Sequence, residues 1–234
     1  ARCALKERPL ILSSGVSKLA DIEAAVENAR AVNPAISLAL LHCITSYPAP
    51  EREYNLRLLP LLSALFSLPV GVSDHSRDPE LVPALSCVMG ASIIEKHICL
   101  SRSDAGLDDP IALEPKDFTR MVRSIRRVVI EGREETLTRL KKERGGDCVE
   151  AVLGNGQKAL APSEEANYYR TRRSIHAIEA LPRGHRLSLR DMAILRTEKV
   201  LRPGLGPEHF EALEGHTLSR DVPAGEGIRF EDIS

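Results

Sequence analysis

Four side chains with acid–base or metal-binding chemistry lie near the ends of two apolar, strand-like runs. Ser73 and His75 end the first run, and Glu95 and His97 lie at the end of the second. Side chains alternate between the two faces of a strand, so the members of each pair share a face. If both faces point inward, two imidazoles and a carboxylate meet. Such a set suits a divalent ion that keeps open positions, Mn²⁺, Mg²⁺, Co²⁺ or Zn²⁺, and acts as a Lewis acid on a carbonyl oxygen.

The alternative for each histidine is a structural hydrogen bond, which is the common role of a single histidine at a strand end. Two histidines at equivalent ends of consecutive strands, each beside a hydroxyl or a carboxylate, favour a shared site. His42 is out of phase with the polar residues that follow its strand, so we predict a structural role for it. The hydroxyls of Ser13, Thr45 and Ser73 are predicted donors to an anion, for which phosphate is the natural candidate.

These residues belong to a stretch in which short aliphatic runs alternate with helical patterns, the signature of βα units around a parallel sheet. The predicted strands span residues 9–15, 36–43, 68–74 and 92–98. Parallel strands present their carboxyl ends at one edge, where loops gather functional groups. We therefore expect the polar strand ends to meet there. Asp78 followed by Pro79 predicts the start of the third helix.

The rest of the chain departs from this alternation. Residues 1–132 are predicted to form one domain of βα units on a parallel sheet, and the charged and Gly-bearing residues 133–170 a linker with some helix. Within the last domain, residues 171–234, one pattern occurs twice, at 180–192 and 221–233. Each copy reads as a strand end, a Pro/Gly turn, a short strand and an Asp that caps a turn. The two copies predict a small, pseudo-symmetric, β-rich module.

Composition narrows the function classes. The 234 residues are 43% hydrophobic with a net charge of −1, as in a globular protein, and give nucleic acid no electrostatic attraction. There is no apolar run of about 18 residues and no signal-peptide pattern, so no membrane insertion is expected. The five cysteines form no C-x-x-C pair, which favours reduced thiols and a cytoplasmic location.

Seven segments resemble the sialic acid synthase family, of the N-acetylneuraminate synthase type, in their order and spacing. They are PLILSSG, LLHCITSYPAP, NLRLLPLL, PVGVSDHS, GASIIEKHICL, LDDPIALEP and LRPGLG. Members of that family join a TIM barrel to a C-terminal SAF (antifreeze-like) domain, which the doubled Pro-Gly module resembles. The resemblance implies condensation of phosphoenolpyruvate with an N-acylated mannosamine or a related sugar. The products are a nine-carbon 2-keto acid and phosphate, released by C–O cleavage.

The resemblance also assigns roles to residues of this sequence. His75 and His97 would hold the metal, Mn²⁺ first with Mg²⁺ or Co²⁺ as alternatives, and Glu95 would be the acid/base group. The phosphoenolpyruvate contacts would be Ser13, Thr45 and Ser73. The amino sugar contacts would be Tyr47, Asp108 and Arg202. Because Arg202 would reach from the SAF domain into the partner subunit's site, the resemblance implies a domain-swapped homodimer.

The sequence departs from the family pattern most clearly in its strand number. A (β/α)8 barrel takes about 250 residues and eight strands, whereas four strands precede the linker here. We therefore expect an α/β fold equivalent to strands five to eight, the C-terminal half of the barrel, in an N-terminally truncated chain with impaired activity. Two alternatives stay open. One is a non-catalytic remnant whose SAF-like module binds carbohydrate or a partner, and the other is a metal-dependent hydrolase.

Overall fold

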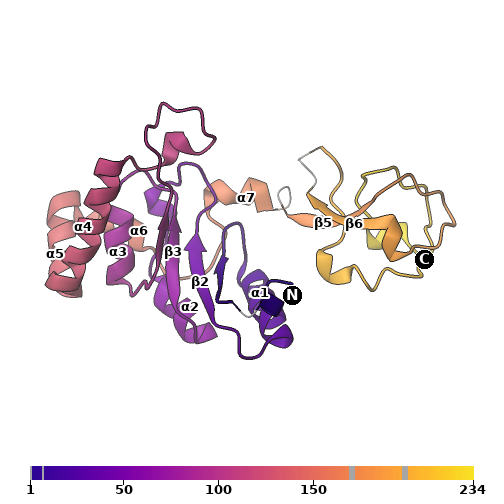
Figure 1. Ribbon diagram of the computed structural model, residues 1–234, viewed down its shortest axis with the longest axis horizontal. Helices are drawn as coiled ribbons and strands as arrows, with labels where there is room; N and C mark the ends of the chain where they lie inside the picture. Colours follow the sequence, from indigo (N-terminus) through magenta and orange to yellow (C-terminus); the bar gives the residue numbers. More distant parts are fainter. Residues whose placement is uncertain (1, 7, 169–171, 197–199) are drawn as a thin grey trace. The chain divides into compact units, whose positions relative to one another are not determined.

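The computed structural model divides the chain into two compact units, Ala1–Glu165 and Ala166–Ser234 (Figure 1). The residues that the structure describes are 2–6, 8–168, 172–196 and 200–234. Residues 169–171, where the predicted linker gives way to the predicted last domain, lie outside the described residues. Each unit has its own hydrophobic core, so each is described by itself.

The first unit is built on a four-stranded parallel sheet with the strand order β1-β2-β3-β4. The strands are β1 (Leu10–Ser13), β2 (Leu38–Cys43), β3 (Val70–Asp74) and β4 (Ile94–Lys96). Each strand begins one or two residues after its predicted start. The predicted parallel half-barrel is confirmed, with β1 and β4 as its edges.

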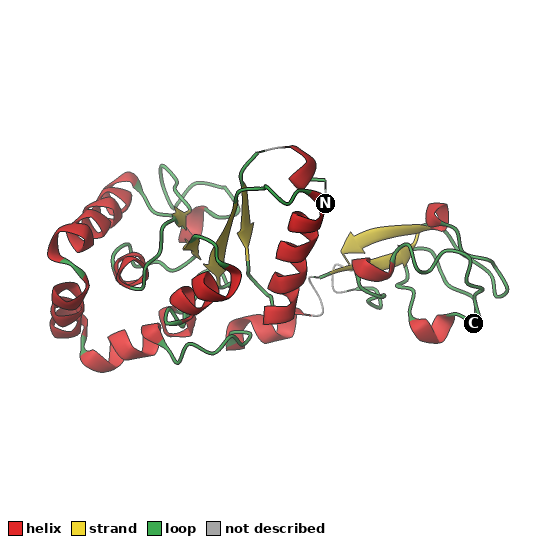
Figure 2. Cartoon of the chain, turned by 90° about the horizontal axis from the view of Figure 1, so that it is seen from below, coloured by secondary structure: helices red, strands yellow, loops and turns green. Residues whose placement is uncertain are grey.

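Four helices alternate with these strands and flank the sheet in Figures 1 and 2. They are α1 (Leu19–Val32), α2 (Leu58–Phe66), α3 (Leu81–Val88) and α4 (Pro115–Glu131). The predicted start of α3 at Asp78 and Pro79 is two residues early, since the helix begins at Leu81. Asp78 still supports this end of the helix, because its Oδ1 accepts the backbone N–H groups of Glu80 at 2.7 Å and Leu81 at 2.9 Å. Such capping satisfies donors that have no partner inside the helix.

The strand register separates two faces of the sheet. Leu40 and Val72 lie on the helix-covered face and are buried in the core. Cys43 is in register with Ser73, and Ser73 with Glu95, on the opposite face. Period-two alternation thus places the predicted site residues of β3 and β4 on the inner face, away from the helices.

The apolar stripe of α4 is only partly covered. Met121 is buried, whereas Val129 is 79% exposed. Together with Phe118, Val122 and Ile125 these residues line a groove of about 710 Å³ beside β4. The stripe predicts a helix correctly, but at the edge of a four-stranded sheet part of it faces solvent.

Residues 133–165 differ from the predicted linker, because they belong to the first unit and are largely helical. Three helices occupy this region: α5 (Arg133–Arg144), α6 (Gly146–Leu153) and α7 (Pro162–Tyr168). Leu140 and Val152 are buried against the core of the first unit. The sequence conceals this packing since α5 buries only one aliphatic side chain and is otherwise mostly charged.

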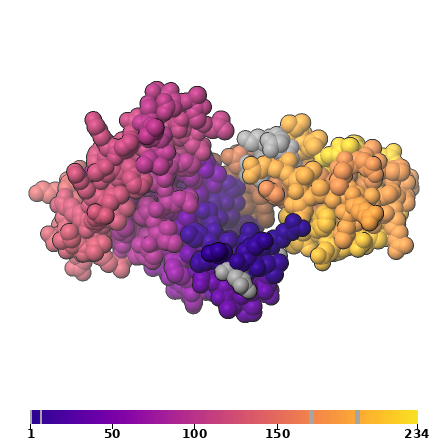
Figure 3. All heavy atoms as spheres, viewed as in Figure 1, coloured from indigo at the N-terminus to yellow at the C-terminus, as the bar shows by residue number. Residues whose placement is uncertain are grey.

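The segment between β4 and α4 protrudes from the first unit (Figures 1 and 3). It contains a short 3-10 helix, Asp109–Ile111, directly after Asp108. No helix in the described part of the chain is long and apolar enough to cross a membrane.

The second unit contains the antiparallel pair β5 (Arg173–Ala177) and β6 (Met192–Arg196) and shows the predicted internal symmetry. Leu181 and Val222, at the same position of the two copies, exchange backbone hydrogen bonds of 2.8 Å. The aspartate that the two copies share lies at the end of a 3-10 turn, whereas the pattern predicts it at the start of one. Asp191 accepts the backbone N–H of Ser188 three residues earlier.

Asp232 occupies the same place in the second copy and carries a larger network. Its side chain is 1% exposed and accepts the backbone N–H of Arg229 at 2.8 Å and Nε of Arg220 at 2.5 Å. Arg202 also donates to it. Burial acts to raise the pKa of Asp232, but the hydrogen bonds from Arg220, from the Arg229 backbone and from Arg202 outweigh it, so the pKa is lowered and the carboxylate stays ionised.

Replacing Asp232 by Asn is expected to destabilise the second unit by about 2 kcal/mol, because it removes the buried carboxylate that accepts hydrogen bonds from the partly exposed guanidinium groups of Arg202 and Arg220. The matched change Asp191→Asn removes a less buried carboxylate and should cost about 1 kcal/mol. Amide hydrogen exchange of β5 and β6 measures both losses. Equal losses for the two variants would contradict the network as described.

Candidate active site

Three aromatic rings converge at the carboxyl edge of the sheet. The ring centroids of His75 and His97 are 5.3 Å apart. Tyr47, from the segment after β2, lies 4.3 Å from His75 and 5.9 Å from His97, again between ring centroids. The sequence predicts that these strand ends meet, and the two imidazoles do lie side by side.

The hydrogen bond of His75 fixes which ring nitrogen is free. Nδ1 lies 2.9 Å from the carbonyl oxygen of Ile44, so Nδ1 carries the proton and donates it. Burial lowers the pKa of His75, which favours the neutral ring. Nε2 therefore keeps a lone pair, the state that a metal ligand needs. His97 approaches a carboxylate instead, with Nδ1 3.7 Å from Oδ2 of Asp108.

The two imidazoles could supply two of the ligands of a metal ion, but not a complete coordination shell. Among the described residues, no group of three or more His, Cys, Asp or Glu side chains is arranged to hold an ion. An ion bound by His75 and His97 would keep positions for water and substrate. A hydrolase with a two-metal centre would want further ligands, which the described residues do not bring together.

Ser73 and Glu95 form a direct contact on the inner face. Ser73 Oγ donates to Oε1 of Glu95 at 2.6 Å, and the residues are paired in register on β3 and β4. Ser73 is 3% exposed, whereas Glu95 is open to solvent. The predicted anion donor and the predicted acid/base group are thus neighbours, and the carboxylate is accessible to a ligand.

Cys43 was not among the predicted site residues, yet it lies in the site. Its Sγ is 3.8 Å from Oγ1 of Thr45 and 3.8 Å from Nδ1 of His75. Burial raises the pKa of Cys43 to about 11, which keeps it a protonated thiol. Period-two spacing before Thr45 is the sequence signal that could have found it.

The two remaining predicted anion donors lie at the ends of the first two strands. Ser13 is the last residue of β1, is exposed, and pairs with Leu41 on the inner face. Thr45 follows β2, and its backbone N–H donates to Oε1 of Glu164 at 2.7 Å. Ser13, Thr45 and Ser73 thus occupy successive strand ends, in the order the sequence predicts.

The charged residues between the site positions form a buried ion pair on the outer face. Lys96 Nζ lies 2.8 Å from Oδ2 of Asp74, and the side chains are 1% and 0% exposed. Tyr54 donates from its hydroxyl to Oδ1 of Asp74 at 2.7 Å. The same hydroxyl accepts the backbone N–H of His75 at 2.8 Å. The pair therefore supports the backbone that carries His75.

His42 is a structural residue, as its phase predicts. It is 2% exposed, and its Nε2 donates to the carbonyl oxygen of Tyr54 at 2.5 Å. Burial lowers the pKa of His42 from 6.5 to about 4.

The buried neutral His42 predicts a stability loss in mild acid. The unfolded chain takes up a proton at this residue below about pH 6.5, whereas the folded chain resists until about pH 4. Stability is therefore fully present above pH 6.5, and about 3 kcal/mol of it is lost as the pH falls to about 4. Urea unfolding across this range should show the loss in the wild type and a flatter profile in His42→Gln. An identical pH slope in the two proteins would contradict the assignment.

Arg202 belongs to the second unit, where carboxylates surround its guanidinium. Besides Asp232, its partners are Glu226 at 3.1 Å and Glu231 at 3.0 Å. Its role at the amino sugar, and the domain-swapped homodimer that the role implies, stay predictions.

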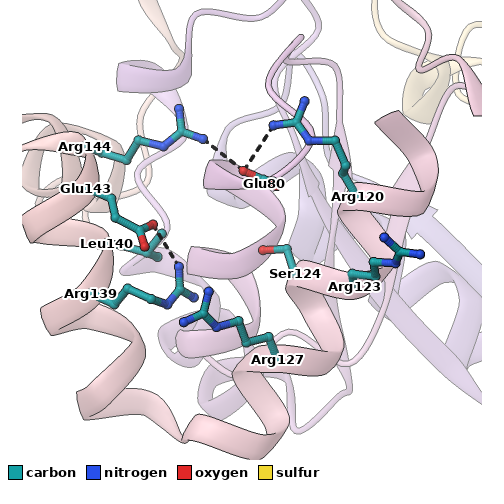
Figure 4. A pocket seen from close by; sticks show the side chains of 9 residues that line it. All are labelled: Glu80, Arg120, Arg123, Ser124, Arg127, Arg139, Leu140, Glu143 and Arg144. Atoms are coloured by element: carbon teal, nitrogen blue, oxygen red, sulfur yellow. Dashed lines mark hydrogen bonds and ion pairs between the residues drawn. The ribbon is translucent and has the colours of Figure 1, made fainter. Parts of the chain in front are cut away.

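Away from the strand ends, a polar cavity of about 420 Å³ lies between α4 and α5 (Figure 4). Its arginines are Arg120, Arg123, Arg127, Arg139 and Arg144. Glu80 takes an ion pair from Arg120 at 3.4 Å and one from Arg144 at 3.3 Å, and Arg139 pairs with Glu143 at 3.0 Å. Because four of these arginines, Arg120, Arg127, Arg139 and Arg144, already have carboxylate partners, the cavity is better described as an ion-pair network that attaches α5 to its neighbours.

Comparison with known proteins shows the family to which the chain belongs. The sequence model of the NeuB family matches residues 1–135, and that of the SAF domain matches residues 172–234. The N,N'-diacetyllegionaminic acid synthase of Legionella pneumophila is 32% identical over 99% of this chain and 58% of its own length. The N-acetylneuraminate-9-phosphate synthase of Drosophila melanogaster is 30% identical over 94% of this chain and 59% of its own length.

A solved structure agrees with the sequence relatives. The spore coat polysaccharide biosynthesis protein SpsE of Bacillus subtilis is 32% identical, with a TM-score of 0.84 over 99% of this chain and 62% of that one. The chain thus spans a little under two thirds of the length of the proteins that it matches. The half-barrel, the strand-end site and the doubled module all fall within the matched residues, and the chain belongs to the NeuB family and carries a SAF domain.

Proposed function

We propose that this chain carries the carboxyl-edge site of a synthase that condenses phosphoenolpyruvate with an N-acylated mannosamine or a related amino sugar. The observation that supports this most is the convergence of His75, His97 and Tyr47 beside the contact between Ser73 and Glu95. Relatives about a third identical are synthases of legionaminic acid and of N-acetylneuraminate 9-phosphate. The products would be a nine-carbon 2-keto acid and phosphate.

The reaction needs an anion site, an electrophile and a proton carrier. A carbon–carbon bond forms between C3 of phosphoenolpyruvate and the aldehyde carbon, water adds at C2, and the C2–O bond to phosphate breaks. Glu95, accessible and hydrogen-bonded to Ser73, is the proposed proton carrier at the reacting carbons. Ser13, Thr45 and Ser73 are the proposed phosphoenolpyruvate donors.

The amino sugar is proposed to lie against the imidazole pair. Tyr47 is 49% exposed and stacks on His75, so its free face is open to a sugar ring. Asp108 approaches His97 from the protruding segment. A divalent ion held by His75 and His97, Mn²⁺ first with Mg²⁺ or Co²⁺ as alternatives, would polarise the aldehyde oxygen.

The test uses the purified chain with Mn²⁺, N-acetylmannosamine and phosphoenolpyruvate labelled with ¹⁸O in the oxygen between C2 and phosphorus. The expected result is sugar-dependent phosphate release with the label in the phosphate, since the C–O bond breaks. We expect the rate to lie below that of the longer relatives, because the four-stranded sheet supplies only part of the contacts that orient substrate. Release independent of the sugar, or unlabelled phosphate, would contradict the proposal.

A further inference from the structure

Glu164 joins two strand-end loops through one buried carboxylate oxygen. Its Oε1 accepts the backbone N–H of Val16, after β1, and that of Thr45, after β2, each at 2.7 Å. The side chain is 0% exposed although it comes from α7, more than a hundred residues later in the chain. Hydrogen bonds to an ionised acceptor are roughly twice as strong as neutral ones, so the carboxylate holds both loops firmly.

The two loops also contact each other. A Cβ at Gly15 would overlap Oγ1 of Thr45, so the loop after β1 packs directly on the Thr45 hydroxyl. Val16 adopts a φ of 48° in the left-handed region, which a β-branched residue seldom occupies. Such strained residues persist only where the surroundings hold them, and they cluster at functional sites. The bond from Val16 to Glu164 is one interaction that holds this conformation.

We propose that Glu164 is a positioning residue for phosphoenolpyruvate. It fixes the loop that directly follows Ser13 and the loop that carries Thr45, so that both hydroxyls face the phosphate, and it does so without contacting the substrate. The inference rests on the proposed function, which assigns these two hydroxyls to phosphoenolpyruvate. The inference adds Glu164, a residue outside the strand-end motifs, as the side chain that orders the two loops.

The chain offers a matched control in Glu53. Its Oε2 accepts the backbone N–H of Ser163 at 3.1 Å, one residue before Glu164. Glu53 therefore ties down the same first turn of α7 but bonds to neither Val16 nor Thr45. If Glu164 served only to anchor α7, removing either carboxylate would have the same effect.

The experiment measures phosphoenolpyruvate affinity by calorimetry and amide hydrogen exchange by NMR. In Glu164→Ala, we expect the dissociation constant to rise about 20-fold and exchange at Val16 and Thr45 to accelerate about 100-fold. In Glu164→Gln, which keeps an acceptor oxygen and guards against a folding failure, the affinity loss should be about 5-fold. In Glu53→Ala, both quantities should stay within about 2-fold of the wild type.

Two results would overturn the inference. One is an equal loss of affinity in the Glu164→Ala and Glu53→Ala variants, and the other is unchanged exchange at Val16 and Thr45 when Glu164 is removed. A wild-type chain that binds no phosphoenolpyruvate would instead contradict the proposed function. The exchange measurement would then still decide whether Glu164 orders the two loops.

Discussion

Replacing His75 by alanine is expected to lower sugar-dependent phosphate release from phosphoenolpyruvate by about 100-fold or more. The ring keeps its Nε2 lone pair free because Nδ1 donates to the carbonyl oxygen of Ile44. It also stacks on Tyr47 and lies next to His97. Its loss removes one of the two imidazoles proposed to hold the metal. Steady-state phosphate release with Mn²⁺ measures the effect.

The matched control is His209→Ala, in the second unit, where the imidazole packs on Phe230. We expect its phosphate release to equal that of the wild type. Thermal unfolding of both variants separates a catalytic loss from a loss of fold. A His75→Ala protein that is folded and retains activity within about 3-fold of the wild type would exclude a role for this imidazole in the reaction.

Replacing Lys96 by methionine is expected to lower the free energy of unfolding of the first unit by about 3 to 5 kcal/mol. The change leaves Asp74 as a buried charge without its cation, and both side chains are almost fully buried. Lys96 Nζ also donates to the carbonyl oxygen of Ser76 at 2.5 Å, and the methionine variant removes this hydrogen bond as well. Urea unfolding followed by circular dichroism measures the loss.

An ion pair of the same length at the surface provides the comparison. Lys141 and Glu150 also lie 2.8 Å apart, but each side chain is 44% exposed. Because water screens this pair, Lys141→Met should lower the free energy of unfolding far less than Lys96→Met does. The double variant Asp74→Asn with Lys96→Met should regain part of the loss, since no unpaired charge remains. Equal costs for the two lysine variants would contradict the importance of burial.

The sequence predicts the sheet and its functional edge because both depend on short-range patterns. Alternation of aliphatic runs and helical stripes is sufficient for four parallel strands. Period two is sufficient to place Ser73 with His75 on one face of its strand, and Glu95 with His97 on one face of the next. The doubled Pro-Gly pattern likewise predicts a pseudo-symmetric module, and the structure shows the two copies paired through Leu181 and Val222. In each case the signal lies within about a dozen residues.

What the sequence does not reveal depends on contacts between distant segments. Asp74 and Lys96 look like part of the strand-end chemistry, but their phase sends them to the outer face, where they neutralise each other. Helix α5 reads as a linker because its charged side chains hide the burial of Leu140. Glu164 has no motif around it, and only the fold brings its carboxylate to Val16 and Thr45.

The central claim is that phosphoenolpyruvate binds at the carboxyl edge of the sheet, and an NMR titration with this compound tests it most directly. We predict that the backbone amide signals of Ser13, Thr45 and Ser73 shift together along one saturating curve. The arginine-lined cavity of Figure 4 is the rival anion site on the first unit. Saturable shifts around Arg120 and Arg144, with the strand ends unchanged, would contradict the account.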